Sequence, residues 1–204
     1  MTAARHRRYP RHVDRCDECG FDYADVSPDE LPTLLRAFAG RYAAALTEVR
    51  QVRRRPAEGV WSPLEYACHV RDVLGVQAER LALALRVDEP EFAPMGRDER
   101  AVAEAYNEQD PATVLATLGA AADDLADRFR VLGPADLART GIYPWPRPHA
   151  RTLLWLGRHT IHEGEHHLLD IRRAARSQAA HQDPGDRPGR RTTEAGPVAG
   201  EDRP

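Results

Sequence analysis

The stretch HTIHEGEHHLLDI, residues 159–171, places four histidines and two glutamates within nine residues. Apolar residues continue on both sides at spacings of three and four, which is the period of one face of an α-helix. The stretch therefore predicts a helix that carries several potential metal ligands. Two explanations remain open from this stretch alone. The histidines either form a solvated face, or they bind a metal ion together with a further ligand from elsewhere in the chain.

Two pairs of these side chains are spaced four residues apart, so each pair lies on one helical face and can reach a single ion. Glu163 with His167 and His162 with His166 are the two pairs, and they point about 100° apart. A helix turns its apolar face toward the core, so Glu163 and His167 are expected inward and the other pair near a rim. The inward series also holds Leu153, Leu156, Thr160 and Ile171, whereas the other holds Trp155, His159 and Asp170.

Three further segments have the same helical period, so the fold class is expected to be all-α. Two of them begin with a capping box, SPDE at residues 27–30 and SPLE at residues 62–65. There the serine caps the helix, the proline takes its first position and the glutamate closes the box. Pro32 leaves open a later start of the first helix, near Asp29 or Leu31. The expected helices cover about residues 27–52, 62–87, 110–132 and 149–177, with a short one within 98–108.

Four amphipathic helices in 204 residues most simply form an antiparallel or crossover four-helix bundle. No segment shows the alternation typical of a strand, and the proline-rich GIYPWPRPHA, residues 141–150, is expected to be a non-helical loop. The expected organisation is a short N-terminal arm with a CxxC over residues 1–26, the bundle over 27–176 and a disordered tail over 177–204, rich in Gly, Pro and charge.

Bulk composition narrows the classes of partner. The net charge is −3, from 29 basic and 32 acidic residues, which argues against a nucleic-acid partner. No run approaches the roughly 18 apolar residues of a membrane span, and no apolar segment follows the basic N-terminus as in a secretory signal. Three cysteines, an odd number, make a disulfide framework unexpected, so the cytoplasm is the expected location.

An inward Glu163 needs a partner, because an unpaired buried carboxylate is costly. An arginine would serve, and so would a divalent metal, which uses three protein ligands and an open position when it takes part in chemistry. The third ligand must come from another helix, and His69 is the histidine in the middle of the second one. The alternative for His69 is an ordinary hydrogen-bonded histidine of the core or rim.

Two stretches carry a resemblance to a known family: WSPLEYACHVRDV, residues 61–73, and HEGEHHLLDI, residues 162–171. Over residues 27–176 the chain resembles the DinB-like superfamily, which includes bacillithiol- and mycothiol-linked transferases and mycothiol-dependent maleylpyruvate isomerases. The resemblance implies a divalent metal, zinc or nickel, at one end of the bundle. It implies His69, Glu163 and His167 as ligands, with Glu163 where many members have histidine. If the register is off by one, His162 and His166 form the pair.

The resemblance also implies a function. A low-molecular-weight thiol of the mycothiol type would bind as co-substrate, become a thiolate at the metal and attack an electrophile, as in an S-transferase or isomerase. His166 and Asp170 are candidates for supporting roles beside the metal, and Arg158 for meeting a substrate carboxylate. Two alternatives remain: a non-catalytic metal-binding or interaction bundle, with a homodimer through exposed helix faces, and a metal-dependent hydrolase.

The CxxC at Cys16 and Cys19 raises a separate question. A structural zinc needs four ligands, and the chain has no second CxxC, so His6, His12 or a dimer would have to complete the set. A redox pair and two unlinked thiols in the arm are the alternatives. The aromatic residues Phe21 and Tyr23 are expected to pack the arm onto the bundle.

Overall fold

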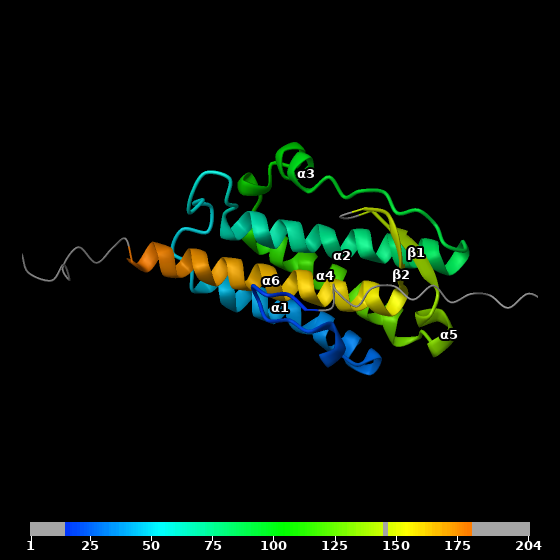
Figure 1. Cartoon of the computed structure of the whole chain (residues 1–204). Coiled ribbons are helices and arrows are strands. Elements are labelled where there is room, and N and C mark those ends of the chain that lie inside the picture. Colours follow the sequence, from blue (N-terminus) through cyan, green and yellow to red (C-terminus); the bar gives the residue numbers. More distant parts are fainter. Residues whose placement is uncertain (1–14, 145–146, 181–204) are drawn as a thin grey trace, which may run out of the picture.

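The computed structural model describes residues 15–144 and 147–180, and helices dominate both ranges (Figure 1). The α-helices of the bundle are α1 (Leu31–Thr47), α2 (Pro63–Arg86), α4 (Pro111–Arg130) and α6 (Leu153–Ala180). The smaller elements are η1 (Tyr23–Asp25), η2 (Pro28–Glu30), α3 (Arg97–Ala103), η3 (Tyr106–Glu108), α5 (Pro134–Leu137), β1 (Thr140–Tyr143) and β2 (His149–Thr152). The expected four long helices and the short helix near residue 100 are confirmed.

The four long helices form a bundle in which α1 and α2 occupy diagonal corners. Each of these two packs against both α4 and α6. Helices α1 and α6 run in one direction, and α2 and α4 run in the other (Figure 1). The connection from α1 to α2 therefore crosses to the opposite corner. This is the crossover form of the bundle, and it makes α2 and α6 antiparallel neighbours.

The sequence signals for helix starts act as expected. At the start of α2, the Ser62 side chain accepts a hydrogen bond from Glu65 N at 3.2 Å, and Glu65 Oε2 accepts one from Ser62 N at 2.7 Å. Before α1, residues Pro28–Glu30 form a 3-10 turn and the α-helix begins at Leu31. The later of the two expected starts is correct there, because Pro32 suits the first turn of a helix but not its interior.

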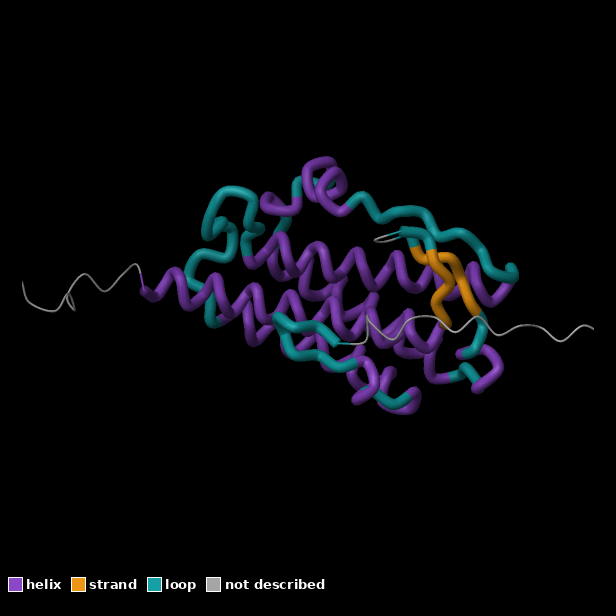
Figure 2. Tube along the Cα trace, viewed as in Figure 1, coloured by secondary structure: helices purple, strands orange, loops and turns teal. Residues whose placement is uncertain are grey.

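The expectation that the chain contains no strand was wrong. Strands β1 and β2 pair antiparallel, with Thr140 opposite Thr152 and Tyr143 opposite His149 (Figure 2). Ile142 also exchanges backbone hydrogen bonds with a distant segment, because its N–H donates to Pro90 O at 2.8 Å and its carbonyl accepts from Phe92 N at 3.0 Å. Since residues 149–152 belong to this hairpin, α6 begins at Leu153 rather than near His149.

Helix α6 extends to Ala180, past the boundary expected at Arg176. The Gln178 side chain explains the extension, because its amide donates to Gln51 O at 3.0 Å and its carbonyl accepts from Gln51 N at 3.1 Å. The rest of the expected tail lies outside the described residues. Within residues 15–144 and 147–180, none of the helices is both long and apolar enough to cross a membrane.

The N-terminal arm lies against α6, as the aromatic residues predicted. The Tyr23 side chain is 5% exposed, and its ring stacks on Trp155 with centroids 5.9 Å apart. The Phe21 ring lies beside the His162 ring, with centroids 5.6 Å apart. Arg158 fixes the end of the arm by donating to Val26 O at 2.8 Å. Arg158 therefore faces the arm and not a substrate pocket.

Candidate metal centre

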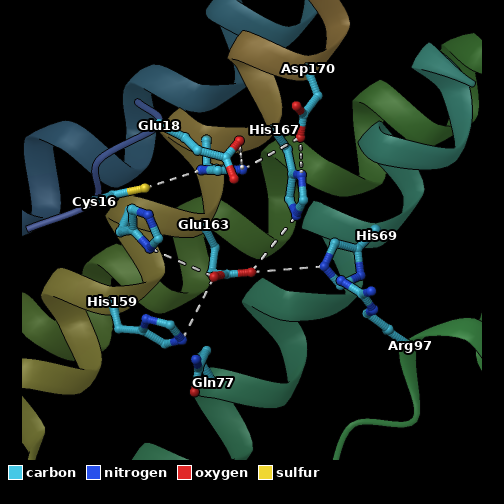
Figure 3. Close-up of polar contacts among 12 residues, drawn as sticks. Cys16, Glu18, His69, Gln77, Arg97, His159, Glu163, His167 and Asp170 are labelled. Carbon is cyan, nitrogen blue, oxygen red and sulfur yellow. Dashed lines mark hydrogen bonds and ion pairs between the residues drawn. The ribbon is translucent and has the colours of Figure 1, made fainter. Parts of the chain in front are cut away.

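Three side chains from α2 and α6 converge as the sequence pattern predicted. The Glu163 Oε2 atom lies 4.0 Å from His69 Nε2 and 3.8 Å from His167 Nε2. The potential ligand atoms of these three residues all lie within 4.8 Å of one another. Figure 3 shows the Glu163 carboxylate in the centre, with both imidazoles pointing toward it. One ion can therefore reach all three after small side-chain rotations.

The amphipathic pattern of the two helices explains this convergence. Glu163 and His167 are one turn apart on the inner face of α6, and His69 lies on the neighbouring, antiparallel α2. His69 and His167 are 3% and 8% exposed, whereas the Glu163 side chain keeps 26% of its surface accessible. The two histidines are therefore buried, whereas the Glu163 carboxylate is partly accessible to solvent. Such partial access is typical of a metal site that admits a further ligand.

The protonation states also suit a divalent ion. Burial lowers the pKa of His69, so its imidazole is neutral near pH 7. Burial alone would raise the pKa of Glu163, but the nearby imidazoles of His69, His159 and His167 hold it well below the ordinary range. Metal ligands must be deprotonated to bind. His69 and Glu163 meet that condition. An N,N,O donor set suits zinc, nickel, iron or manganese.

Asp170 lies behind His167, in the position of a supporting residue. Its Oδ2 atom is 3.0 Å from His167 Nδ1, which leaves His167 Nε2 facing Glu163. A carboxylate behind a histidine ligand fixes the ring orientation and makes the ligating nitrogen more basic. His69 lacks such a partner, because its Nδ1 is buried without a hydrogen bond to any described residue. The Trp61 ring packs on it instead, with centroids 5.1 Å apart.

The alternative histidine pair faces the arm rather than His69. His166 Nδ1 lies 3.5 Å from Cys16 Sγ, and its Nε2 lies 3.9 Å from Asp170 Oδ2. The potential ligand atoms of His162, His166, Cys16 and Cys19 form a second group within 4.8 Å. The register alternative thus corresponds to a different cluster on the same helix. His69, Glu163 and His167 are called the triad below. Of the two expected supporting residues, only Asp170 forms a hydrogen bond with a residue of the triad.

Replacing Asp170 with alanine is expected to weaken metal binding at the triad about 10-fold, because His167 loses its orienting carboxylate. The affinity for zinc is measured by competition with a chromophoric chelator. Both Cys16 and Cys19 are replaced by serine in this background, so that the second cluster does not contribute. The control is Asp123→Ala, which removes an exposed carboxylate on α4. Equal affinities for the two variants would contradict a supporting role for Asp170.

A pocket of about 580 Å³ opens beside the triad, and His69 and Glu163 form part of its wall. Arg80 lines the pocket too, although its side chain is only 7% exposed. The guanidinium donates to Ala93 O at 2.7 Å and lies over the Tyr143 ring at 4.9 Å. None of the ion pairs among the described residues includes Arg80. Because Arg80 has no carboxylate partner among the described residues, this buried cation is available to pair with an anionic group of a ligand.

His159 and Arg80 line the pocket, although neither was expected there from the sequence. His159 Nε2 lies 3.8 Å from Glu163 Oε1, and its Nδ1 lies 2.8 Å from the Tyr23 hydroxyl. Burial lowers the pKa of His159 to about 4, so the ring stays neutral. A signal for Arg80 was present, because it follows His69 by eleven residues, which is three helical turns on the same face. No such signal exists for His159, which lies in a polar series.

The fold and the site together define a class of protein: a crossover four-helix bundle with an N,N,O donor set on two antiparallel helices beside an open pocket. The chain belongs to the DinB superfamily, whose sequence model matches residues 25–171. The resemblance to this family, expected over residues 27–176, is therefore confirmed. A comparison with curated proteins gave no match.

Two solved structures share the fold. YfiT from Bacillus subtilis, described as "a probable metal-dependent hydrolase with an unusual four-helix bundle topology", has a TM-score of 0.68 and 20% identity, covering 76% of this chain and 90% of that chain. The mycothiol-dependent maleylpyruvate isomerase has a TM-score of 0.59 and 16% identity over 73% of this chain. The match covers 62% of the isomerase, so this chain spans less than two thirds of that protein.

Proposed function

We propose that the chain is a metal-dependent enzyme of the thiol S-transferase or isomerase type, with His69, Glu163 and His167 as the metal ligands. The observation that carries the proposal is the convergence of these three donors, within 4.8 Å, beside an open pocket whose wall includes His69 and Glu163. A divalent metal held there would supply Lewis acidity that lowers the pKa of a thiol or water. A low-molecular-weight thiol of the mycothiol type is the proposed co-substrate, in a reducing cytoplasm where thiols persist.

Other residues that line the pocket also have roles in this proposal. A volume of about 580 Å³ falls in the usual range for small-molecule sites and leaves room for an electrophile beside the thiol. Arg80 would bind an anionic group of the electrophile, since its guanidinium faces the pocket without a carboxylate partner. His159, neutral and hydrogen-bonded to Tyr23, would hold the second carboxylate oxygen of Glu163. Val73 and Met95 supply apolar wall that excludes water.

The test uses untagged, metal-loaded protein, with mycothiol or cysteine and a panel of electrophiles that differ in having a free or an esterified carboxylate. Thiol consumption that requires metal and electrophile together is the expected result. Arg80→Gln should raise KM about 10-fold for the free carboxylates and leave the esters unchanged, because a hydrogen bond to a charged group is lost.

Two other outcomes would overturn this proposal. Consumption of esters or amides without any thiol would assign the site to a hydrolase, in line with the description of YfiT. Metal uptake without turnover in either assay would assign it to a binding module. His69→Ala is the inactive control in both assays, because it removes one of the three proposed metal ligands and leaves the arm untouched.

A further inference from the structure

A second group of donor side chains lies on the opposite side of the candidate centre from His69. Cys16 and Cys19 come from the N-terminal arm, and His162 and His166 come from consecutive turns of α6. The ligand atoms of all four lie within 4.8 Å of one another. Figure 3 shows Cys16 reaching toward α6, where its Sγ lies 3.5 Å from His166 Nδ1. Residues nearly 150 positions apart in the chain thus form one compact cluster.

The backbone of the arm holds both thiols on one side of a tight turn. Gly20 N–H donates to Cys16 O at 2.8 Å, and Cys16 N–H donates to Phe21 O at 2.8 Å. Gly20 has a φ of +75°, a conformation that other residues adopt only with strain. Arg15 and Asp22 close the turn by an antiparallel bridge. The turn therefore brings the two cysteines close together without a bound ligand.

An unpartnered atom points to a ligand within this cluster. His162 Nε2 is buried and has no hydrogen-bond partner among the described residues. The other ring nitrogen, Nδ1, lies 3.1 Å from the Tyr23 hydroxyl, so the ring cannot turn without losing that contact. A buried polar atom without a partner costs on the order of 1–3 kcal/mol. A metal ion bound at Nε2 would remove this cost.

We propose that Cys16, Cys19, His162 and His166 bind a second ion, a structural zinc, which fastens the arm to α6. Two cysteines and two histidines are a common closed ligand set for structural zinc. Zinc bond lengths place tetrahedral N and S ligands about 3.3–3.8 Å apart, so the cluster needs only a modest contraction. In this proposal, the two ligands that complete the zinc set with the CxxC come from α6. His6 and His12, which were the expected candidates, lie outside the described residues.

The second ion would also orient the first site. Zinc at His162 Nε2 leaves the proton on Nδ1, which then donates to the Tyr23 oxygen at 3.1 Å. The Tyr23 hydroxyl in turn donates to His159 Nδ1 at 2.8 Å. His159 then carries its proton on Nε2, which faces Glu163 Oε1 at 3.8 Å. The arm therefore acts as a positioning element for the carboxylate of the triad.

The experiment loads cobalt(II) into the reduced, untagged full chain and records metal content and absorption spectra. About two ions per chain are expected, with a thiolate-to-cobalt charge-transfer band in the near ultraviolet, because cysteine sulfur ligates one of them. The Cys16→Ser/Cys19→Ser double variant should lose one ion and the band. Cys68→Ala is the matched control and should keep both, since Cys68 is buried in the core, where its thiol donates to Tyr106 O.

His69→Ala should keep the band while losing the other ion, so failure of this proposal is distinguishable from failure of the proposed enzyme function. Absence of the charge-transfer band in the reduced wild-type protein would overturn the inference, whether or not the serine variants fold. A band that survives in the double variant would overturn it as well. Helical circular dichroism of the double variant is expected to match the wild type, because the four helices do not include the cysteines of the arm.

Discussion

His69→Ala is expected to lower metal affinity at the triad by more than about 100-fold, which exceeds the usual effect of replacing a residue that only hydrogen-bonds a ligand. The variant leaves only Glu163 and His167, both on α6, and an ion held from one helix keeps too few protein ligands. Zinc or nickel binding is measured by calorimetric titration in the Cys16→Ser/Cys19→Ser background, so that only the triad contributes. Thiol turnover should fall to the level without metal.

A matched control separates ligand loss from a general effect of removing an imidazole. His149 lies on β2, outside the clusters of potential metal ligands among the described residues, and its Nδ1 contacts Arg147 O. His149→Ala should therefore bind metal as the wild type does. Unchanged affinity in His69→Ala would show that the ion does not depend on α2. The proposed site would then be wrong.

Gly164→Ala is expected to lower the free energy of unfolding by about 2 kcal/mol, as overpacking in a well-filled core typically does. A Cβ at this position would lie 2.2 Å from Phe38 Cζ, and the Phe38 ring is fully buried. The backbone cannot easily retreat, because Gly164 O accepts a hydrogen bond from the Tyr42 hydroxyl at 2.9 Å. The gain in helix propensity, about 1 kcal/mol, offsets only part of this clash. Urea unfolding monitored by circular dichroism measures the difference.

Gly40→Ala is the control for the propensity effect. Gly40 lies on the exposed face of α1, and an added Cβ would meet no atom within 4 Å. This variant should be more stable than the wild type by up to about 1 kcal/mol. If Gly164→Ala instead matched Gly40→Ala, α6 would not approach α1 as closely as the structure shows.

The convergence of the triad could be predicted from the sequence largely because one physical rule governs the placement of its residues. The inward direction of Glu163 and His167 follows from the apolar residues that share their helical face, and that rule does not depend on distant contacts. His69 required one additional step, the assumption that two amphipathic helices face the same core. Family resemblance then supported both assignments, and the structure brings the three side chains together.

The missed features depend on contacts between distant segments. Strands β1 and β2 have four residues each, which is too short for a period of two to stand out, and Ile142 is held by a backbone exchange with residues 90–92. The CxxC and the second histidine pair are separated by more than 140 residues, so no spacing rule joins them. His162 and His166 were expected near a rim, but no sequence pattern indicated that the arm would cover that rim.

A crystal structure of the zinc-loaded chain, with anomalous data at the zinc edge, would show directly whether His69, Glu163 and His167 share one ion. We expect an anomalous peak about 2.0–2.2 Å from Nε2 of His69, Nε2 of His167 and a carboxylate oxygen of Glu163. A loaded crystal with no anomalous density between these three side chains would contradict this expectation.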